Sequence, residues 1–459
     1  MGKNNFSRRK FLASAATVGA VGAMGVGTLS SCSSPGGSDA GSGAAANCDW
    51  VKRDLKFPPL LDKVPDGKVL KAGVIGCGGR GSGAAINFLD AGGKTVTITA
   101  LGDVFDDRLG SLRKKLMNHE SKTEIADENC FIGFDAFEKV IASGVDIVIL
   151  ATPPKFRPQQ FEAAVKARKH VFMEKPVAVD PVGIRQVIAA AKMADAAGLK
   201  VVTGTQRRHE LSYINLIKEL NDNNGIGKIT GANVYWNGGK LWHRNNKPDW
   251  SEMEWMIRDW VNWTWLSGDH IVEQHVHNLD VANWFIGTHP TKALGFGSRQ
   301  RRVTGDQYDN FSIDYVYDDG MHIHSMCRQI NSCSNGVYEI FHGTKAIATT
   351  VGHKPQIVDA EGNQLFLAEK AEISPYVQEH KDLITCIRQN IPFNEAENTA
   401  LSVMTAIMGR VSAYTGKTVT FEEMMNSDMK LGPDTFIMGN VGYMAKAEVP
   451  VPGTLERKK

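Results

Sequence analysis

Cysteine is sparse and scattered in this sequence, and no two cysteines stand in a CxxC pair. Seven cysteines among 459 residues, without regular spacing, do not form a disulfide framework. Excess charge is lacking as well, because 52 basic side chains face 50 acidic ones and leave a formal net charge of +2. The chain therefore has no electrostatic footprint for nucleic acid. One tight basic cluster, "RQRR" at residues 299–302, fits a solvated strand end.

Hydrophobic runs are short. The first apolar stretch, residues 11–26, follows four basic residues and is too short to span a bilayer comfortably. Hydrophobic residues at 42% and charged residues at 22% are ordinary values for a globular protein. A chain of 459 residues suits two domains and a tail, and no internal repeat is evident.

The amino terminus has the features of an export signal. "SRRKFL" resembles the twin-arginine signal, and "LSSC" at residues 29–32 resembles a bacterial lipobox. The resemblance implies a signal peptide over residues 1–31 and an acylated Cys32 that anchors an exported, periplasmic lipoprotein to the membrane. An ordinary signal peptide with a chance cysteine is the alternative. Residues 32–66 begin with a Gly/Ser/Ala-rich stretch and are predicted to form a flexible tether.

Residues 67–206 alternate short apolar strands with helical stretches, as in "VLKAGVIG" followed by "SGAAINFLDAGG". This alternation predicts an α/β, Rossmann-type domain with a doubly wound parallel sheet. Residues 207–459 differ, because strands such as "NFSIDYVYDDGMHIHSMCR" show period-two alternation around a turn at 318–320. We expect an α+β domain with an open, mainly antiparallel sheet and carboxyl-terminal helices. One of its helices is predicted to run from Glu273 to Phe285.

The segment Gly76–Gly81 fits G-x-G-x-x-G in the required context, after a strand and at the start of a helix. Gly76 allows a tight turn, Gly78 lets the backbone approach a pyrophosphate, and Gly81 allows close helix–strand packing. Asp103 ends the second strand, where a carboxylate accepts the ribose hydroxyls of NAD and repels the 2′-phosphate of NADP. Arg108 softens that preference, so the predicted cofactor is NAD or NADP, with NAD favoured. The remaining predicted cofactor contacts are Gly79, Arg80, Thr152, Pro153, Glu174 and Lys175.

"EKP" at residues 174–176 ends a strand at the ligand-binding edge of the sheet. Pro176 disfavours helical geometry at Lys175, so Lys175 stays extended there. A lysine in this place can polarise a substrate oxygen beside the nicotinamide. A surface lysine before a turn is the alternative for an isolated "KP".

"GCGGRG", "ATPP" and "EKPVAVD", in this order, resemble the glucose–fructose oxidoreductase, inositol dehydrogenase and rhizopine catabolism superfamily. The resemblance covers the chain from about residue 69 onward and implies that Lys175 acts at the active site. The family's second signature places an acid four residues before a catalytic histidine. In "GDHIVEQHVHNLD" it gives Glu273 and His277, with Asp280 following. Glu stands where the family has Asp, so the role of Glu273, orienting His277 or binding substrate, stays open.

His277 can take or return a hydroxyl proton while a hydride moves to the nicotinamide. Taken alone, it would more often be a core or surface histidine. A metal is the other alternative, through the i, i+4 pair Glu273–His277, but His275 points away from His277 on a helix. We therefore predict catalytic residues Lys175, His277 and Glu273, and no metal.

"TGTQRRHE" leaves the last strand of the first domain at the same sheet edge. Tryptophan-rich, polar stretches follow at residues 236–250 and 256–269, and they suit either stacking on a sugar ring or an oligomer interface. Pairing of second-domain sheets is common in the family, so a homo-oligomer is expected. The predicted substrate contacts are Gln206, Arg208, His209, Trp236, Arg258 and Asp280.

An exported protein has no soluble pool to replace its dinucleotide, so each catalytic cycle must return the cofactor to its starting state. We therefore favour a periplasmic NAD(P)-dependent oxidoreductase that acts on a sugar or glycoside hydroxyl, with carbon 3 as one option, and that holds its cofactor tightly. A first alternative is an NAD-dependent glycoside hydrolase that works by transient oxidation and elimination. A second is a non-catalytic carbohydrate-binding lipoprotein. The expected partners are a small-molecule carbohydrate and a lipid anchor, without nucleic acid.

Overall fold

The computed structural model describes residues 52–121, 123–370, 372–433 and 435–454, all of which belong to one compact unit. The predicted signal peptide, Cys32 and the first part of the predicted tether lie outside the described residues. Across the described ranges, none of the helices combines the length and the apolar character needed to cross a membrane.

The first sheet has six parallel strands in the order β3-β2-β1-β4-β5-β6. All four residues of β4 are buried, as expected for a strand covered on both faces. The predicted doubly wound sheet is confirmed. Its strand order reverses between β1 and β4, so ligands are expected beyond the carboxyl ends of these strands. The strands are β1 (Leu70–Ile75), β2 (Val96–Asp103), β3 (Cys130–Ile132), β4 (Ile147–Leu150), β5 (His170–Met173) and β6 (Val201–Thr203).

The helices of this part connect successive parallel strands. Asp180 begins α6 by accepting a hydrogen bond from the Gly183 amide, and Pro181 fits the first helical position, where no amide donor is needed. The α-helices are α2 (Gly79–Gly92), α3 (Asp106–Met117), α4 (Ala136–Ala142), α5 (Arg157–Lys166) and α6 (Pro181–Ala196). The 3₁₀ turns are η1 (Gly93–Thr95), η2 (Asp127–Asn129), η3 (Pro154–Phe156) and η4 (Gln206–His209).

The second sheet is large, open and mainly antiparallel, as predicted, with the order β14-β13-β12-β11-β7-β10-β9-β8-β15. Within this second sheet of the described residues, β7 and β10 are the one parallel pair of neighbouring strands, and the other pairs are antiparallel. Alternate residues of β9 and β10 are buried, which is the period of a sheet with one covered face. The strands are β7 (Ile229–Gly238), β8 (Lys292–Ser298), β9 (Asn310–Val316), β10 (His322–Gln329), β11 (Gly336–Gly343), β12 (Ile347–Thr349), β13 (Gln356–Val358), β14 (Gln364–Leu367) and β15 (Val419–Thr420).

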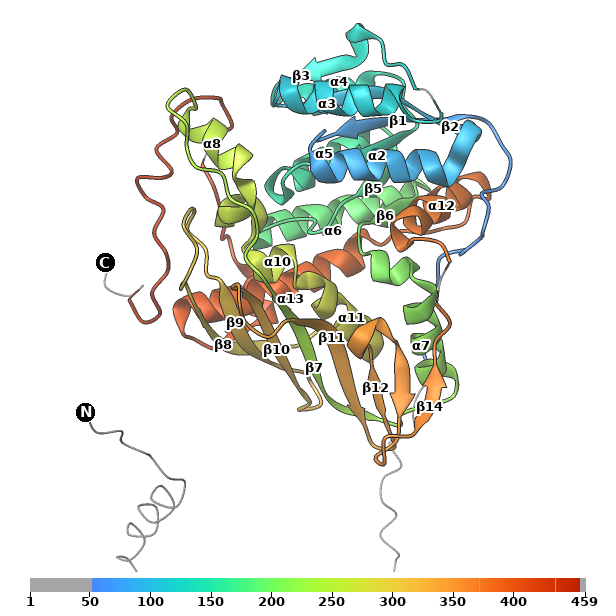
Figure 1. Ribbon diagram of the computed structural model, residues 1–459, viewed down its shortest axis with the longest axis vertical. Coiled ribbons are helices and arrows are strands. Elements are labelled where there is room, and N and C mark those ends of the chain that lie inside the picture. The colour runs from blue at the N-terminus through green and yellow to red at the C-terminus, as the bar shows by residue number, and fades with distance from the viewer. Residues whose placement is uncertain (1–51, 122, 371, 434, 455–459) are drawn as a thin grey trace, which may run out of the picture. The chain divides into compact units, whose positions relative to one another are not determined.

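Helices α11 and α13 pack on this sheet, and α13 also packs on α6 (Figure 1). One hydrophobic cluster therefore continues from the parallel strands through these helices to the large sheet. The helices are α7 (Leu211–Asp222), α8 (Glu252–Arg258), α9 (Thr264–Ser267), α10 (His270–Glu273), α11 (Val276–Ile286), α12 (Pro375–Arg388), α13 (Ala396–Thr415) and α14 (Phe421–Asn426). The 3₁₀ turns are η5 (Trp260–Asn262) and η6 (Val351–His353).

Two predictions about local structure are wrong. The helix expected from Glu273 to Phe285 is broken, because α10 ends at Glu273 and α11 begins at Val276. The flexible tether is predicted to extend to residue 66, but residues 52–66 make hydrogen bonds and apolar contacts with the folded part of the chain. The Arg53 guanidinium donates to the carbonyls of Trp284 and Phe285, and the Leu60 amide donates to Asp382. Leu55, Phe57 and Leu60 pack against the core, so apolar burial and hydrogen bonds order this segment.

Candidate active site and cofactor cleft

The glycine loop between β1 and α2 leaves room for a ligand in front of the first residues of α2, where the glycine motif predicts a pyrophosphate. Gly76 has a φ of +92°, and a Cβ there would lie 2.5 Å from the Thr152 amide nitrogen. A Cβ at Gly81 would lie 1.8 Å from the Gly76 carbonyl oxygen, so only glycine allows this packing. Gly78 and Gly79 instead face open space, at the amino-terminal end of the 14-residue helix α2. Exposed helix amides beside open space fit a pyrophosphate.

Asp103 ties the glycine loop to the segment after β2. Its carboxylate accepts hydrogen bonds from the backbone amides of Cys77 (2.6 Å) and Phe105 (2.9 Å). Burial raises the pKa of Asp103, and these backbone hydrogen bonds oppose that rise. Asp103 also lines the cleft, so the predicted contact with a ribose hydroxyl remains compatible with its position.

A cleft of about 320 Å³ extends from the glycine loop along the carboxyl ends of the strands. Predicted cofactor residues from three loops line it: Gly76, Gly78, Gly79, Arg80, Asp103, Arg108, Thr152 and Pro153. Its opposite wall comes from the segment after β7, through Trp242, Arg244, Ile257, Arg258 and Trp260. Arg258, predicted to contact substrate, thus lines the dinucleotide cleft. The sequence marked this segment only by its tryptophans in polar surroundings.

At the end of the cleft, hydrogen bonds from two guanidinium groups hold the "EKP" segment. Arg80 donates to Glu174 (2.5 Å) and to Glu379 on α12 (3.3 Å). Burial, reinforced by the neighbouring charge of Glu174, raises the pKa of Glu379 well above its ordinary range. The guanidinium of Arg157 donates to the carbonyl oxygens of Glu174 and Pro176. These contacts fix the backbone on both sides of Lys175.

Lys175 is bound to Glu273. Its Nζ donates to the Glu273 carbonyl oxygen (2.5 Å) and to its carboxylate (3.0 Å), and both side chains are 14% exposed. The described residues contain no hydrogen bond between Glu273 and His277. Of the two roles left open for Glu273, orienting His277 is therefore absent here, and Glu273 positions Lys175 instead.

His277 lies near this pair on α11, 6% exposed, with its ring stacked on Trp236 at 5.6 Å between centroids. Burial lowers the pKa of His277 well below its ordinary range, and the charges of Lys175, Arg207 and Arg80 lower it further. Within the part of the chain that the structure describes, no hydrogen bond reaches the His277 ring. Burial and these cations thus favour the uncharged form of the imidazole.

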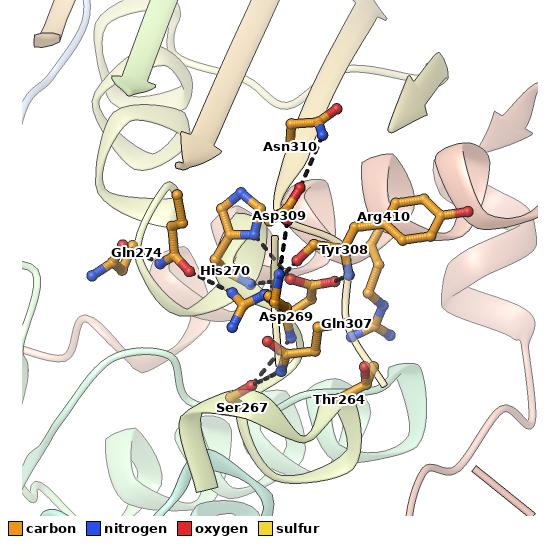
Figure 2. A network of polar contacts seen from close by, with 12 residues as sticks. Thr264, Ser267, Asp269, His270, Gln274, Gln307, Tyr308, Asp309, Asn310 and Arg410 are labelled. Atoms are coloured by element: carbon orange, nitrogen blue, oxygen red, sulfur yellow. Dashed lines mark hydrogen bonds and ion pairs between the residues drawn. The ribbon is translucent and has the colours of Figure 1, made fainter. Parts of the chain in front are cut away.

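A buried polar network holds the chain where α10 ends and α11 begins, next to Glu273 (Figure 2). Asp269, with a φ of +72°, accepts hydrogen bonds from the His270 amide, the Tyr308 amide and the Tyr414 hydroxyl. Gln329 on β10 donates to the Gln274 side chain (2.6 Å), next to Glu273. A left-handed Asp269 and a tethered Gln274 hold the break between α10 and α11. The network, rather than helical periodicity, therefore places Glu273 against Lys175.

The remaining predicted substrate residues divide into two groups. Gln206 stays available, because its side-chain oxygen is buried without a partner among the described residues. Trp236 stacks on His277 and so lies beside the proposed site. Arg208 and Asp280 instead form a bidentate pair with each other at 2.8 and 2.9 Å. For Arg208 or Asp280 to contact a substrate as predicted, this pair would have to break.

His209 does not fit a substrate contact. It is 1% exposed, and its ring nitrogens lie 2.7 Å from Asp382 and 3.2 Å from Glu395. Both ring nitrogens are therefore occupied by carboxylates, and we correct its prediction from substrate ligand to structural ion pair. Arg207, which the sequence also offers as a candidate to hydrogen-bond a substrate, lies with its guanidinium 5.9 Å from the Trp236 ring and donates to Glu339. The described residues contain no group of three or more His, Cys, Asp or Glu side chains placed to hold a metal.

Two family models match the chain. One describes an oxidoreductase family with an NAD-binding Rossmann fold and matches residues 70–202, and the other describes a GFO/IDH/MocA carboxyl-terminal domain and matches residues 214–349. Together they cover more than half of the sequence, including the glycine loop, Lys175, Glu273 and His277.

Curated relatives are distant. A myo-inositol 2-dehydrogenase of Thermotoga maritima is 26% identical over 231 residues, which are 50% of this chain and 58% of that protein. A 2,7-anhydro-N-acetylneuraminate hydratase of Escherichia coli is 27% identical over 182 residues, which are 39% of this chain and 44% of that protein. The chain thus spans about half the length of these relatives.

Among solved structures, scyllo-inositol dehydrogenase from Lactobacillus casei, with bound NAD(H) and scyllo-inositol, matches with a TM-score of 0.58 and 20% identity. The match covers 77% of this chain and 100% of that chain. A UDP-N-acetylglucosamine 3-dehydrogenase from Acidithiobacillus ferrooxidans matches with a TM-score of 0.58 and 16% identity, over 76% of this chain and 98% of that chain. These similarities show a shared fold.

Proposed function

Because the chain belongs to the GFO/IDH/MocA oxidoreductase family, with an NAD-binding Rossmann domain, we propose that it oxidises a hydroxyl group of a sugar, polyol or glycoside. Carbon 3 of a glycoside is one option for the position oxidised. The observation that carries the proposal is that a lysine held by Glu273, Lys175, lies near His277, whose ring accepts and donates no hydrogen bond among the described residues and whose pKa is lowered by burial and by the charge of Lys175.

The glycine loop fits a dinucleotide, since Gly78 and Gly79 face open space in front of the α2 amides. A nicotinamide held by this loop would supply the hydride acceptor for the carbon that carries the substrate hydroxyl. Lys175 polarises the substrate oxygen, and the Glu273 carboxylate holds its ammonium group in place. His277 accepts the hydroxyl proton, because burial keeps its imidazole neutral at physiological pH. Trp236 keeps the ring of His277 in a fixed plane.

Tight cofactor binding is part of the proposal, because an exported enzyme must recycle its dinucleotide. The test uses residues 33–459, purified without added cofactor and then denatured to release any bound dinucleotide. We expect a stoichiometric amount of NAD(H) or NADP(H) that changes its redox state after soaking with glucosides or inositols. An empty protein that binds dinucleotide only weakly would contradict internal recycling.

Two alternative functions give different results with the same preparation. A hydrolase that oxidises its substrate transiently would cleave a glycoside without a net change in bound dinucleotide. The similarity to a protein named as a hydratase supports keeping this alternative. A carbohydrate-binding lipoprotein would keep its sugar affinity when Lys175 and His277 are both replaced by alanine, whereas an enzyme would lose turnover. His322→Asn, at an exposed histidine on β10, is the matched control.

Export and anchoring at Cys32 are proposed from "SRRKFL" and "LSSC". Labelling cells with radioactive palmitate should mark the wild-type chain and leave Cys32→Ser unlabelled. Replacing Arg8 and Arg9 by lysines should retain the precursor in the cytoplasm. Equal labelling of wild type and Cys32→Ser would contradict the anchor.

A homo-oligomer is also proposed. Leu294 and Phe296 on β8 are 51% and 71% exposed, and apolar side chains on an open sheet favour pairing with a second copy. Light scattering on the purified chain measures this directly, and a monomeric mass would contradict it.

A further inference from the structure

Residues 239–262, which follow β7 and end with η5, cross from the second sheet to the dinucleotide cleft. Trp242, Arg244, Arg258 and Trp260 line the cleft opposite the glycine loop. In the same cleft, the Rossmann part contributes Asp103 and its neighbours after β2. An acidic residue at the end of the second Rossmann strand binds the ribose of the adenosine half. The segment therefore faces the adenosine end of the site.

We propose that residues 239–262 form a second wall of the dinucleotide site, which contacts the adenosine half, and that the carboxyl-terminal segment 435–447 fixes this wall in place. The inference deepens the proposed function and rests on it. Its chemistry is stacking of a purine on indole faces, together with guanidinium groups near the ribose and phosphates. A fixed wall retains the bound dinucleotide.

The wall is folded back onto itself by hydrogen bonds. The Asp259 carboxylate accepts from the Arg244 amide (2.7 Å) and from the Asn262 side chain (2.8 Å). The Trp255 indole donates to the Arg244 carbonyl oxygen (2.7 Å). Arg244 thus has a defined backbone position, although its side chain is exposed. These hydrogen bonds hold residues 244–262 in one conformation along the cleft.

Arg258 joins the wall to the Rossmann part. Its guanidinium donates to both carboxylate oxygens of Asp107 on α3 (3.2 Å each) and lies 3.9 Å from the Phe105 ring centroid. Glu254 accepts a further hydrogen bond from Arg258 (2.8 Å). Opening the wall would break this cluster of a cation, two carboxylates and an aromatic ring.

The carboxyl-terminal segment fastens the wall at α8. The Glu252 carboxylate accepts hydrogen bonds from the backbone amides of Val441 (2.6 Å), Gly442 (2.7 Å) and Met444 (2.6 Å). Burial raises the pKa of Glu252, but these amides outweigh burial and lower it below its ordinary value. The charged carboxylate thus holds three amides of a segment distant in sequence.

Aromatic packing continues this attachment to the cleft itself. Phe436 stacks on Trp265 with 6.1 Å between ring centroids and contacts Phe156 at 5.1 Å. Phe134 and Phe156 both line the dinucleotide cleft. The carboxyl-terminal segment therefore binds the wall and the Rossmann loops together. Movement of the wall away from the Rossmann loops would break these contacts.

The test measures the rate at which NADH leaves the full chain, purified in detergent and loaded with NADH. Mixing with excess ADP-ribose prevents rebinding, and NADH fluorescence reports release. We expect Trp242→Ala and Glu252→Gln each to raise the release rate about tenfold, which corresponds to about 1.4 kcal/mol. Trp242 is 46% exposed, so its replacement leaves the core intact. Leu365→Ala, at a 58% exposed apolar residue on β14, is the control and should keep the wild-type rate.

Hydrogen exchange gives a second readout for Glu252→Gln. We expect faster exchange at the amides of residues 441, 442 and 444, together with faster NADH release. Wild-type release rates in both variants would overturn the inference and leave the proposed function standing. A wild-type chain that binds no NADH would overturn both.

Discussion

At the scale of single residues, the environment of His277 determines its chemistry. The sequence allowed a histidine that titrates near physiological pH, with an ordinary pKa of about 6.5. In the structure, burial first and then three nearby cations hold the pKa of His277 well below that value. The imidazole is therefore already neutral at pH 7, as a proton acceptor must be.

A pH profile of turnover tests this assignment. Because His277 must be unprotonated, the turnover rate should not change with pH around pH 7. It should fall only well below pH 6.5, where acid protonates the ring. His277→Asn should lower kcat by about 10²–10⁴-fold and abolish this acid limb. His322→Asn should retain the wild-type profile. An acid limb that survives in His277→Asn would assign the proton acceptor to another group.

His209 shows the opposite electrostatic effect. Burial alone would lower its pKa, but the carboxylates of Glu395 and Asp382 raise it to about 10. The unfolded chain has an ordinary histidine pKa of about 6.5. The ion pairs therefore contribute their full stability below pH 6.5, and this contribution is lost as the pH rises toward 10.

We predict that His209→Gln lowers the free energy of unfolding by about 3–5 kcal/mol at pH 6, because it leaves two buried carboxylates without their cation. The loss should be smaller near pH 10, where the wild-type ring gives up its proton. Urea unfolding at the two pH values measures the difference. An equal loss at both values would show that His209 is neutral in the folded protein.

At the scale of elements, the break between α10 and α11 decides the geometry of the site. A continuous helix would place Glu273 and His277 on one face, four residues apart. Instead, α10 ends at Glu273, whose carbonyl and carboxylate oxygens both receive Lys175. Local sequence pattern favours the helix, but buried hydrogen bonds to Asp269 from Tyr308, just before β9, and to Gln274 from Gln329 on β10 outweigh it.

The turn from β1 into α2 allows a matched glycine test. In Gly81→Ala, the new Cβ would meet a backbone oxygen at 1.8 Å, so the helix must shift. We expect a loss of about 1–3 kcal/mol in unfolding free energy, together with weaker NADH binding. Gly79→Ala has no neighbour within 4 Å and should weaken NADH binding without loss of stability.

Gly110→Ala is the control for these substitutions, because Gly110 lies exposed within α3 with nothing within 4 Å. It should raise stability by about 0.5–1 kcal/mol and leave NADH binding unchanged. Thermal unfolding and NADH titration of the three variants separate packing from ligand contact. Stability loss in Gly79→Ala would contradict the open space assigned to that position.

At the scale of the whole molecule, segments from both ends of the described chain hold distant elements. The Arg53 guanidinium donates to two carbonyl oxygens at the carboxyl-terminal end of α11, where a cation also complements the helix dipole. Residues 435–447 hold α8 in a corresponding way. Neither segment is a helix or strand, so neither has a periodicity that reveals its contacts.

We predict that Arg53→Ala lowers the free energy of unfolding by about 1.5–3 kcal/mol, because two charged hydrogen bonds are lost. Lys52→Ala is the matched control, since its ion pair with Asp222 is exposed and contributes little. Urea denaturation of both variants gives the comparison. Equal stabilities would mean that residues 52–66 do not anchor the folded chain.

The sequence by itself determined the two sheets, the cofactor and the presence of Lys175 and His277. The fold class follows from the spacing of apolar residues along each strand and helix. The glycine loop follows from a six-residue motif whose tight packing only glycine allows. Both features can therefore be read from short stretches of sequence. The family models agree with the resulting fold and cofactor. The predicted roles of individual site residues remain predictions that the experiments above address.

Only the tertiary structure decided which partner each functional side chain has. It paired Lys175 with Glu273, Arg208 with Asp280, and His209 with two carboxylates, and it moved Arg258 into the cofactor cleft. These pairings join residues up to 186 positions apart, as for His209 and Glu395. A buried charge is stabilised by whichever opposite charge the packed fold brings near it, and that depends on the whole chain rather than on any local pattern.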